Sequence, residues 1–421
     1  MTTIYIETFN SSYNAADSEY MAALLKQAKF DPVDALSQGD LVILNVRTVR
    51  GPSAQDVFQR IEWIQKEFPY KPIIIIGCIA NTLPEKLKKF SVLGSKQIHH
   101  IVEAAEETLH NNIVHLLDTE EMPPLNLPKL RKNPSVEIIP LDRGCLSTCA
   151  FCKTKGLETL ESYPLPEIVA VAQKAISEGV QQIWLTSQDS MLYGKDINSS
   201  LAILLKELTI LPGEFKIRLD PGNTADFIRM KLDLIPLLVH SKLFQFLWLT
   251  IPSGSNRILK ECKLNFTKEQ ILDTLAELQA QIPSLTFASS IQVGFPLESE
   301  DDHLQTTDLL RKTNPDLVLI TKHQSTQKGV KAKLPPEETI LHRMDFLQGV
   351  SNNISSIQNE QWLGWKGTLL IEEQSKDASL WIGRNASYKP MSIVGDFKPG
   401  QKVAVKVIKT GISEIRAEVD I

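Results

Sequence analysis

The chain has 421 residues, more than the roughly 250–300 residues at which a single hydrophobic core stops growing, so two or three domains are expected. Apolar residues make up 43% and charged residues 23%, which is ordinary globular usage and excludes a disordered or collagen-like chain. The formal net charge of −5 provides no overall attraction for nucleic acid, so any such contact must come from local basic patches.

The sequence predicts neither a membrane-spanning segment nor an export signal. Its apolar runs, such as residues 73–76, are far shorter than the ~20 residues that a membrane span needs. The first ten residues lack the basic and apolar regions of a signal peptide. Five cysteines, three of them within eight residues, argue against a disulfide framework and for a metal site in a reducing compartment. We expect a soluble, cytoplasmic protein without membrane contact.

The first part of the chain alternates between short apolar strands and amphipathic helices. Strands are predicted at 3–7, 41–44 and 73–76, and helices at 18–28, 54–68 and 85–90. Apolar strands separated by helices favour a parallel sheet that is covered on both faces. Residues 1–125 are therefore predicted to form an N-terminal parallel α/β domain, followed by a proline-rich linker.

The central part repeats the strand–helix alternation in longer units. Strands are predicted at 137–140, 182–186, 215–219, 244–250, 286–293 and 317–320. Such βα units predict a full or partial parallel barrel over residues 136–355. The chemistry of these folds lies at the carboxyl ends of the strands.

The last part changes to short strands with glycine-containing turns. Strands are predicted at 367–371, 380–383, 392–394, 402–410 and 415–419, and the segment from Lys402 alternates apolar and polar residues. Residues 360–421 are therefore predicted to form a small β-barrel of a kind that often binds oligonucleotides. Basic and acidic residues are nearly balanced there, so composition alone leaves RNA binding open.

Three cysteines form the strongest motif in the sequence. Cys145, Cys149 and Cys152 have the spacing C-x3-C-x2-C directly after the first predicted barrel strand. Three thiolates on one loop can hold three irons of a [4Fe-4S] cluster and leave the fourth iron open for a ligand. A structural zinc site lacks its fourth ligand nearby, and a disulfide would leave one cysteine over. We expect one cluster here, whereas Cys262, between charged neighbours, is expected at the surface.

This motif resembles the radical S-adenosylmethionine superfamily, whose open iron chelates S-adenosylmethionine. Further segments occur in the order of one of its families: Glu161-Ser-Tyr-Pro, Trp184-Leu-Thr-Ser, Ser253-Gly-Ser and Gly294-Phe-Pro. Together they resemble the archaeal and eukaryotic tRNA methylthiotransferases that act on N6-threonylcarbamoyladenosine. The resemblance covers nearly the whole chain, including a C-terminal TRAM-like β-barrel.

The resemblance implies S-adenosylmethionine and tRNA as ligands and an electron donor such as ferredoxin or flavodoxin, with the chain acting as a monomer. The resemblance places eight residues near the cofactor: Phe151, Ser187, Gln188, Asp189, Ser253, Gly254, Val293 and Gly294. The alternative roles for these residues are core packing, loop capping or plain turns. Phosphate contacts are expected from basic residues of the C-terminal barrel, namely Lys366, Arg384, Lys389, Lys402 and Lys406.

The N-terminal domain departs from this family. Where the family uses three cysteines for a second cluster, the sequence has Ser11, Arg47 and Cys78. One cysteine cannot hold a cubane, so the sequence predicts one cluster, with Cys78 as a small buried residue. Arg47 is suited to bind an anion, such as a tRNA phosphate or the substrate carboxylate.

The functional prediction is methylthiolation of N6-threonylcarbamoyladenosine at position 37 of tRNA. One alternative is a related radical enzyme on tRNA that lacks the second cluster and has a different or sulfur-free reaction. The other is a tRNA-binding module without catalysis.

Overall fold

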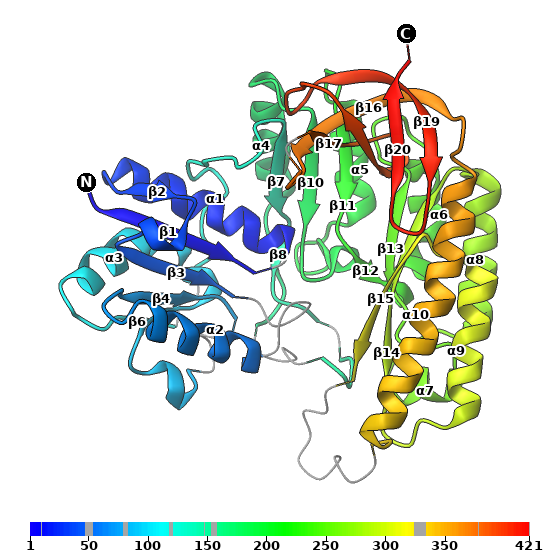
Figure 1. Cartoon of the computed structure of the whole chain (residues 1–421), viewed down its shortest axis with the longest axis horizontal. Helices are drawn as coiled ribbons and strands as arrows, with labels where there is room; N and C mark the ends of the chain where they lie inside the picture. The colour runs from blue at the N-terminus through cyan, green and yellow to red at the C-terminus, as the bar shows by residue number, and fades with distance from the viewer. Residues whose placement is uncertain are drawn as a thin grey trace.

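Three parts follow one another along the chain (Figure 1): a sheet with helices on both faces, an open barrel of parallel strands, and a small closed β-barrel. The computed structural model describes residues 1–9, 11–46, 54–78, 83–117, 121–146, 148–152, 158–323, 334–377 and 379–420. This architecture confirms the predicted α/β fold class. Within the described residues, no helix is both long and apolar enough to cross a membrane.

The N-terminal sheet has six strands in the order β2-β1-β3-β4-β5-β6, and all its neighbours are parallel. Its strands are β1 (Thr3–Thr8), β2 (Asp31–Val33), β3 (Leu41–Asn45), β4 (Ile73–Ile76), β5 (Ser91–Leu93) and β6 (His115–Leu116). Its helices are α1 (Ser12–Gln27), α2 (Ala54–Glu67) and α3 (Ile101–Leu109).

Strand β3 shows why both faces of this sheet are covered. Val42 and Leu44 pack in the core that includes α2, whereas Leu41 and Ile43 pack in the core that includes α1 and α3. Successive side chains of a strand point to opposite faces, so a wholly apolar strand needs a helix on each side.

Two N-terminal predictions are wrong in detail. The expected helix at 85–90 is a short 3-10 turn, Glu85–Leu87, because Ser91 already pairs with Ile74 of the sheet. Helix α1 begins at Ser12, six residues before the predicted start at 18, and the hydroxyl of Ser11 accepts a hydrogen bond from the Asn14 amide at 3.1 Å. That side-chain cap satisfies an amide that would otherwise lack a partner.

The central barrel consists of two parallel sheets, ordered β11-β10-β7 and β12-β13-β14-β15. Its strands are β7 (Val136–Pro140), β10 (Gln182–Thr186), β11 (Lys216–Leu219), β12 (Gly222–Asn223), β13 (Phe246–Thr250), β14 (Thr286–Val293) and β15 (Leu317–Lys322). A bridge between Ile217 and Leu243 joins the sheets, so β7 and β15 are the edges of an open barrel. The six predicted strands are confirmed, with ends shifted by at most two residues.

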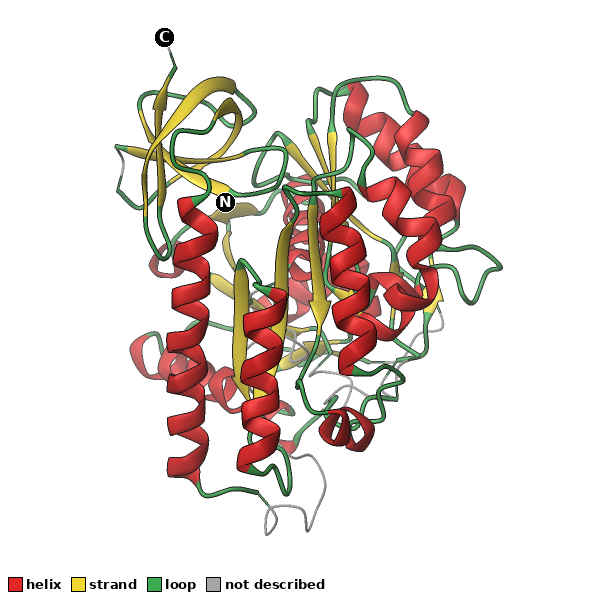
Figure 2. Cartoon of the chain, turned by 90° about the vertical axis from the view of Figure 1, so that its right-hand side faces the viewer, coloured by secondary structure: helices red, strands yellow, loops and turns green. Residues whose placement is uncertain are grey.

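Helices cover the outer face of this barrel. They are α4 (Leu165–Ser177), α5 (Leu201–Ile210), α6 (Thr224–Leu238), α7 (Asn256–Glu261), α8 (Lys268–Gln281), α9 (Glu300–Thr313) and α10 (Glu337–Glu360). Figure 2 shows helices lying over the strands, with the small closed barrel at one end. Apolar side chains from both layers, such as Leu185 of β10 and Leu204 of α5, form the largest core.

The C-terminal barrel is closed in the order β16-β17-β18-β20-β19. Its strands are β16 (Lys366–Gln374), β17 (Leu380–Arg384), β18 (Pro390–Val394), β19 (Lys402–Thr410) and β20 (Ile415–Val419), which confirms the five predicted strands. Closure leaves no strand edge unpaired.

The closed barrel covers the end of the central barrel at which the parallel strands begin (Figure 1). Tyr388, from the β17–β18 turn, inserts between Phe244 and Phe246 with ring centroids 4.8 and 5.1 Å away. The ammonium of Lys389 forms a buried ion pair with Asp316 at 2.6 Å. The carboxyl ends of the strands therefore lie at the opposite end of the central barrel, away from the closed barrel.

Candidate active site

The cysteine loop is closed at its base by a short antiparallel pair of strands, with two residues in each strand. Strand β8 (Asp142–Arg143) pairs with β9 (Glu161–Ser162) just beyond the end of β7. Gly144 follows with φ +78°, and a Cβ there would lie 2.0 Å from the carbonyl oxygen of Thr159. Only glycine fits this close approach. Gly144 therefore allows the start of the cysteine loop to lie directly against its end at Thr159.

The three cysteines of the loop lie close enough to influence one another. The Cys152 amide donates to the carbonyl of Cys149 at 3.2 Å. Burial raises the pKa of the Cys149 thiol to about 12, and negative charge on Cys152, Cys145 and Asp189 adds to the effect. Iron bound to these sulfurs would reverse that preference, because a metal deprotonates the thiols that it binds.

The donor set fits an iron–sulfur cluster. Cys145, Cys149 and Cys152 are partly exposed thiols on one loop, and none of them is in a disulfide. Each can bind a different iron of a cubane, which leaves one iron for a further ligand. The loop also lies at the carboxyl ends of the strands, where barrel enzymes bind their substrates.

The end of β10 supplies a fixed carboxylate beside this loop. Asp189 accepts hydrogen bonds from the amide and the side-chain amide of Asn223, at 2.9 and 2.7 Å. The Ser187 hydroxyl donates to the carboxylate of Asp142 at 2.7 Å. Gln188, which lies between Ser187 and Asp189 in the sequence, is half-buried. Ser187 and Asp189 therefore order the loop, and contact of these three residues with S-adenosylmethionine stays a prediction.

The ends of β13 and β14 pack against helices. Ser253 is fully buried, and its hydroxyl lies 3.1 Å from that of Thr306 in α9. A Cβ on Gly254 would lie 2.4 Å from the carbonyl of Gln305, so that glycine is required by the close approach of α9.

Val293 and Gly294 belong to the same packing layer. Val293 lies in the core shared with α9 and α10, and Gly294 has φ +88° with its amide bound to Glu298 at 2.9 Å. The contacts of Ser253, Gly254, Val293 and Gly294 therefore support a role in packing the ends of β13 and β14 against the helices. Backbone contact with the cofactor stays a prediction.

Cys262 corrects a prediction. It is only 3% exposed and packs with Ile258 and Phe295, with Phe151 of the cysteine loop against the same cluster. The Ala150 amide of the loop donates to the carbonyl of Cys262 at 3.1 Å. Ile258 and Cys262 are four residues apart and share one face of a helical turn, which turns the thiol inward despite its charged neighbours.

Asp220, at the end of β11, is a buried residue between domains that sequence reasoning missed. Its carboxylate accepts from the hydroxyl of Ser12 at 2.6 and 2.7 Å, from Arg218 at 3.0 Å and from Thr186. It therefore connects α1 of the N-terminal domain to the carboxyl ends of β10 and β11. Its position directly after a predicted strand was the signal that could have identified it.

The three N-terminal positions of interest do not form a described cluster of side chains. Ser11 caps α1, and Cys78 is 2% exposed just after β4, as predicted for a small buried residue. Arg47 lies outside the described residues.

The five basic residues expected to contact RNA fall into different environments. The prediction that Lys389 contacts RNA phosphate is wrong, because its side chain is buried against Asp316 and joins the two barrels. Arg384 is also engaged inside the protein, by Glu372 at 2.8 Å and the carbonyl of Tyr388. Lys366 and Lys402 are exposed, each with one acidic partner, and Lys406 is partly exposed. Contact of these last three with RNA stays a prediction.

Comparison with known proteins gives two family matches and relatives that align with nearly the whole of this chain. Residues 3–94 match the uncharacterized protein family UPF0004, and residues 139–310 match the radical SAM superfamily. The human threonylcarbamoyladenosine tRNA methylthiotransferase is 31% identical over 403 residues, which are 93% of this chain and 69% of the relative. A probable enzyme of the same name from Methanothermobacter thermautotrophicus is 27% identical and covers 96% of both chains.

Solved structures share the fold at low sequence identity. The cobalamin-dependent S-adenosylmethionine radical enzyme OxsB superimposes with a TM-score of 0.52 at 15% identity, covering 83% of this chain and 56% of that one. The radical S-adenosylmethionine methyltransferase TsrM from Kitasatospora setae gives 0.52 at 13% identity, covering 76% and 75%.

Proposed function

The chain belongs to the threonylcarbamoyladenosine tRNA methylthiotransferase family, a radical S-adenosylmethionine family, and we propose that it methylthiolates N6-threonylcarbamoyladenosine at position 37 of tRNA. The observation that carries this proposal is the complete cysteine triad on a loop at the carboxyl ends of the barrel strands. A tRNA-binding module without catalysis would have no use for three thiols at that place.

In this proposal the residues of the chain hold and orient the reactants. Cys145, Cys149 and Cys152 would hold one [4Fe-4S] cluster, which when bound supplies the electron and the open iron for cleaving S-adenosylmethionine. Asp189, kept rigid by Asn223, offers a carboxylate acceptor to the cofactor's amino group. Phe151 stiffens the loop by packing on the cluster of side chains around Cys262.

We further propose that the chain holds no second cluster. The Ser11 hydroxyl serves as a helix cap, and neither serine nor arginine is an ordinary iron ligand. Cys78 alone cannot hold a cubane. The sulfur would then come from a small donor in solution, such as sulfide or methanethiol.

Iron analysis tests the number of clusters. We expect anaerobically reconstituted protein to carry about four irons per chain, because a cubane is held by one such set of thiolates. Cys149→Ala should remove the iron and abolish reductive cleavage of S-adenosylmethionine. Cys78→Ala is the matched control and should change neither quantity. About eight irons per chain, reduced to about four by Cys78→Ala, would show a second cluster and contradict the single-cluster proposal.

Mass spectrometry of tRNA nucleosides tests the reaction. In a strain that lacks this gene, the 2-methylthio form of N6-threonylcarbamoyladenosine should disappear and return with the wild-type gene but not with Cys149→Ala. If the 2-methylthio nucleoside is unchanged and another modified nucleoside disappears, the proposed reaction is wrong and the enzyme forms that other nucleoside. We expect the enzyme to work in the cytoplasm as a monomer, with ferredoxin or flavodoxin as electron donor.

A further inference from the structure

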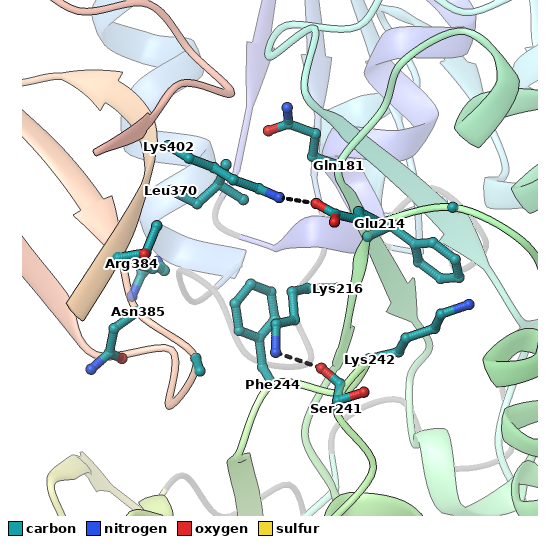
Figure 3. A pocket seen from close by; sticks show the side chains of 14 residues that line it. Gln181, Glu214, Lys216, Ser241, Lys242, Phe244, Leu370, Arg384, Asn385 and Lys402 are labelled. Carbon is teal, nitrogen blue, oxygen red and sulfur yellow. Dashed lines mark hydrogen bonds and ion pairs between the residues drawn. The ribbon is translucent and has the colours of Figure 1, made fainter. Parts of the chain in front are cut away.

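A cavity lies at the junction of the two barrels, far from the cysteine loop. It has a volume of about 420 Å³, which is within the usual range for pockets that bind small molecules. One wall comes from the segments that precede β10, β11 and β13, and the other comes from β16, β17, β19 and the turn after β17 (Figure 3). The described reaction chemistry makes no use of this junction cavity.

The walls of the junction cavity are positively charged. Four cationic residues line it, Lys216, Lys242, Arg384 and Lys402, against one carboxylate, Glu214, although the whole chain carries a net charge of −5. Arg384 is balanced by Glu372 behind the wall. Three lysines against the one carboxylate of Glu214, which pairs with Lys402, leave a net positive charge that attracts an anion.

Lys216 and Lys402 line the cavity from different walls, with the Lys216 ammonium turned toward Ser241 and the Lys402 ammonium toward Glu214 (Figure 3). The Lys216 ammonium donates to the carbonyl of Ser241 at 2.6 Å and is only partly exposed. Its pKa is lowered, first by burial and then by the positive charge of Lys402. An anion bound at Lys402 would lessen that repulsion.

Glu214 occupies part of this position. Its carboxylate lies 2.5 Å from the Lys402 ammonium, as Figure 3 shows, and the two side chains are 86% and 50% exposed. Exposed ion pairs of this kind contribute little to stability. A phosphate, with more charge and more acceptor oxygens, can therefore displace the carboxylate from Lys402.

Part of the cavity floor is apolar. Phe244 and Leu370 are 3% and 8% exposed and form this part together with Ala386 and Thr368. A bare phosphate would leave this surface without contacts. A flat ring attached to the phosphate would cover it and gain the favourable burial of apolar area.

We propose that the junction cavity binds a nucleotide, with its phosphate at the Lys402 ammonium in place of the Glu214 carboxylate and its base over the apolar part of the cavity floor. The nucleotide is either a free one or one residue of a tRNA strand that lies across the junction of the barrels. The second source rests on the proposed function, whereas the first does not.

Equilibrium dialysis with AMP tests the site on the full chain, without cluster or S-adenosylmethionine. Lys402→Gln should weaken AMP binding about tenfold or more, since it removes a charged hydrogen-bond donor. Glu214→Gln should strengthen binding several-fold, because it removes the competing carboxylate. Adenosine, which lacks the phosphate, should bind at least tenfold more weakly than AMP.

Another exposed ion pair of the closed barrel provides matched controls. Lys409 and Glu414 lie 3.5 Å apart and do not line the cavity, so Lys409→Gln and Glu414→Gln should leave AMP binding unchanged. Thermal unfolding of each variant checks the fold, and both substituted cavity residues are exposed enough to be replaced without loss of packing.

Filter binding of unmodified tRNA to the same variants separates the two sources. A free-nucleotide site requires the opposite effects of Lys402→Gln and Glu214→Gln on AMP alone. An RNA site requires the same opposite effects on tRNA affinity, with or without AMP binding. The proposal is overturned if neither AMP nor tRNA binds more weakly to Lys402→Gln and more tightly to Glu214→Gln. It is also overturned if the control variants change affinity by the same amounts. Loss of tRNA methylthiolation in cells is not needed for any of these outcomes.

Discussion

The buried ion pair between Arg143 and Asp17 should stabilise the cysteine loop and the N-terminal domain together. Arg143 is fully buried directly before the loop, and its guanidinium donates to both carboxylate oxygens of Asp17 at 2.8 and 3.0 Å. It also donates to the carbonyl of Ser95 at 3.2 Å and lies over the ring of Tyr13 at 4.8 Å. Asp17, Ser95 and Tyr13 all belong to the N-terminal domain.

The substitution Asp17→Asn keeps the shape of the side chain and removes its charge. The buried guanidinium then lacks a carboxylate, and breaking a buried ion pair in this way costs about 3–5 kcal/mol. With a urea dependence of about 2–3 kcal/mol per molar, the midpoint of urea unfolding should fall by about 1–2 M. Circular dichroism of the full chain in urea measures this shift, and iron per chain after reconstitution reports on the loop.

Glu7→Gln provides the matched control. Glu7 and Arg60 also form a bidentate pair, but their side chains are 18% and 31% exposed. An ion pair that water reaches contributes about 1 kcal/mol or less, so this variant should unfold close to wild type. The double replacement Arg143→Met with Asp17→Leu should recover most of the stability lost in Asp17→Asn, because apolar groups need no charge partner. A midpoint for Asp17→Asn equal to that for Glu7→Gln would refute the reasoning.

Three further predictions concern the loop, the junction and the response to pH. Gly144→Ala should lower both stability and iron content, whereas Gly179→Ala, with φ +91° and no atom within 4 Å of the new Cβ, should cost only about 1 kcal/mol in urea unfolding; equal costs would contradict the close contact at the loop base. Tyr388→Ala should cost about 3–5 kcal/mol and speed proteolytic release of the closed barrel; unchanged proteolysis would show that the ring does not attach it. Burial raises the pKa of Glu19 to about 7, so the unfolded chain loses this proton first and stability should fall by up to about 3 kcal/mol as pH rises from about 4.5 to 7. Glu19→Gln should flatten that fall in urea titrations, and equal slopes for variant and wild type would rule this out.

Strong local patterns made most of the fold predictable. Strands at 182–186, 286–293 and 402–410 were predicted at the bounds that the structure has, because each is an apolar or alternating run with turn residues beside it. Strands β2, β5 and β6, with two or three residues each, escaped prediction. Such short segments become strands only because a neighbouring strand supplies their hydrogen-bond partners.

The residues of the candidate site and its surroundings were likewise predictable only where their partners are near in the sequence. The cysteine triad was evident from the sequence because its three ligands lie within eight residues on one loop. Asp220, Asp17 and the buried position of Cys262 were not, since each also needs a contact with a residue far away in the chain: Ser12, Arg143 and Phe295, respectively. Ser12 and Asp220, for example, are separated by 208 residues and meet only when α1 docks on the barrel.

The sequence by itself determined the order of the longer strands and helices, the motif that would hold a cluster, and the resemblance to one family, because each depends on residues that are near neighbours in the chain. Only the tertiary structure decided which charges face water. Lys389 and Lys402 look alike in the sequence, yet one is buried against Asp316, 73 residues away, and the other lines the junction cavity opposite Glu214, 188 residues away. The environment of a charge depends on what the fold brings beside it, and for these two lysines the partners come from another domain.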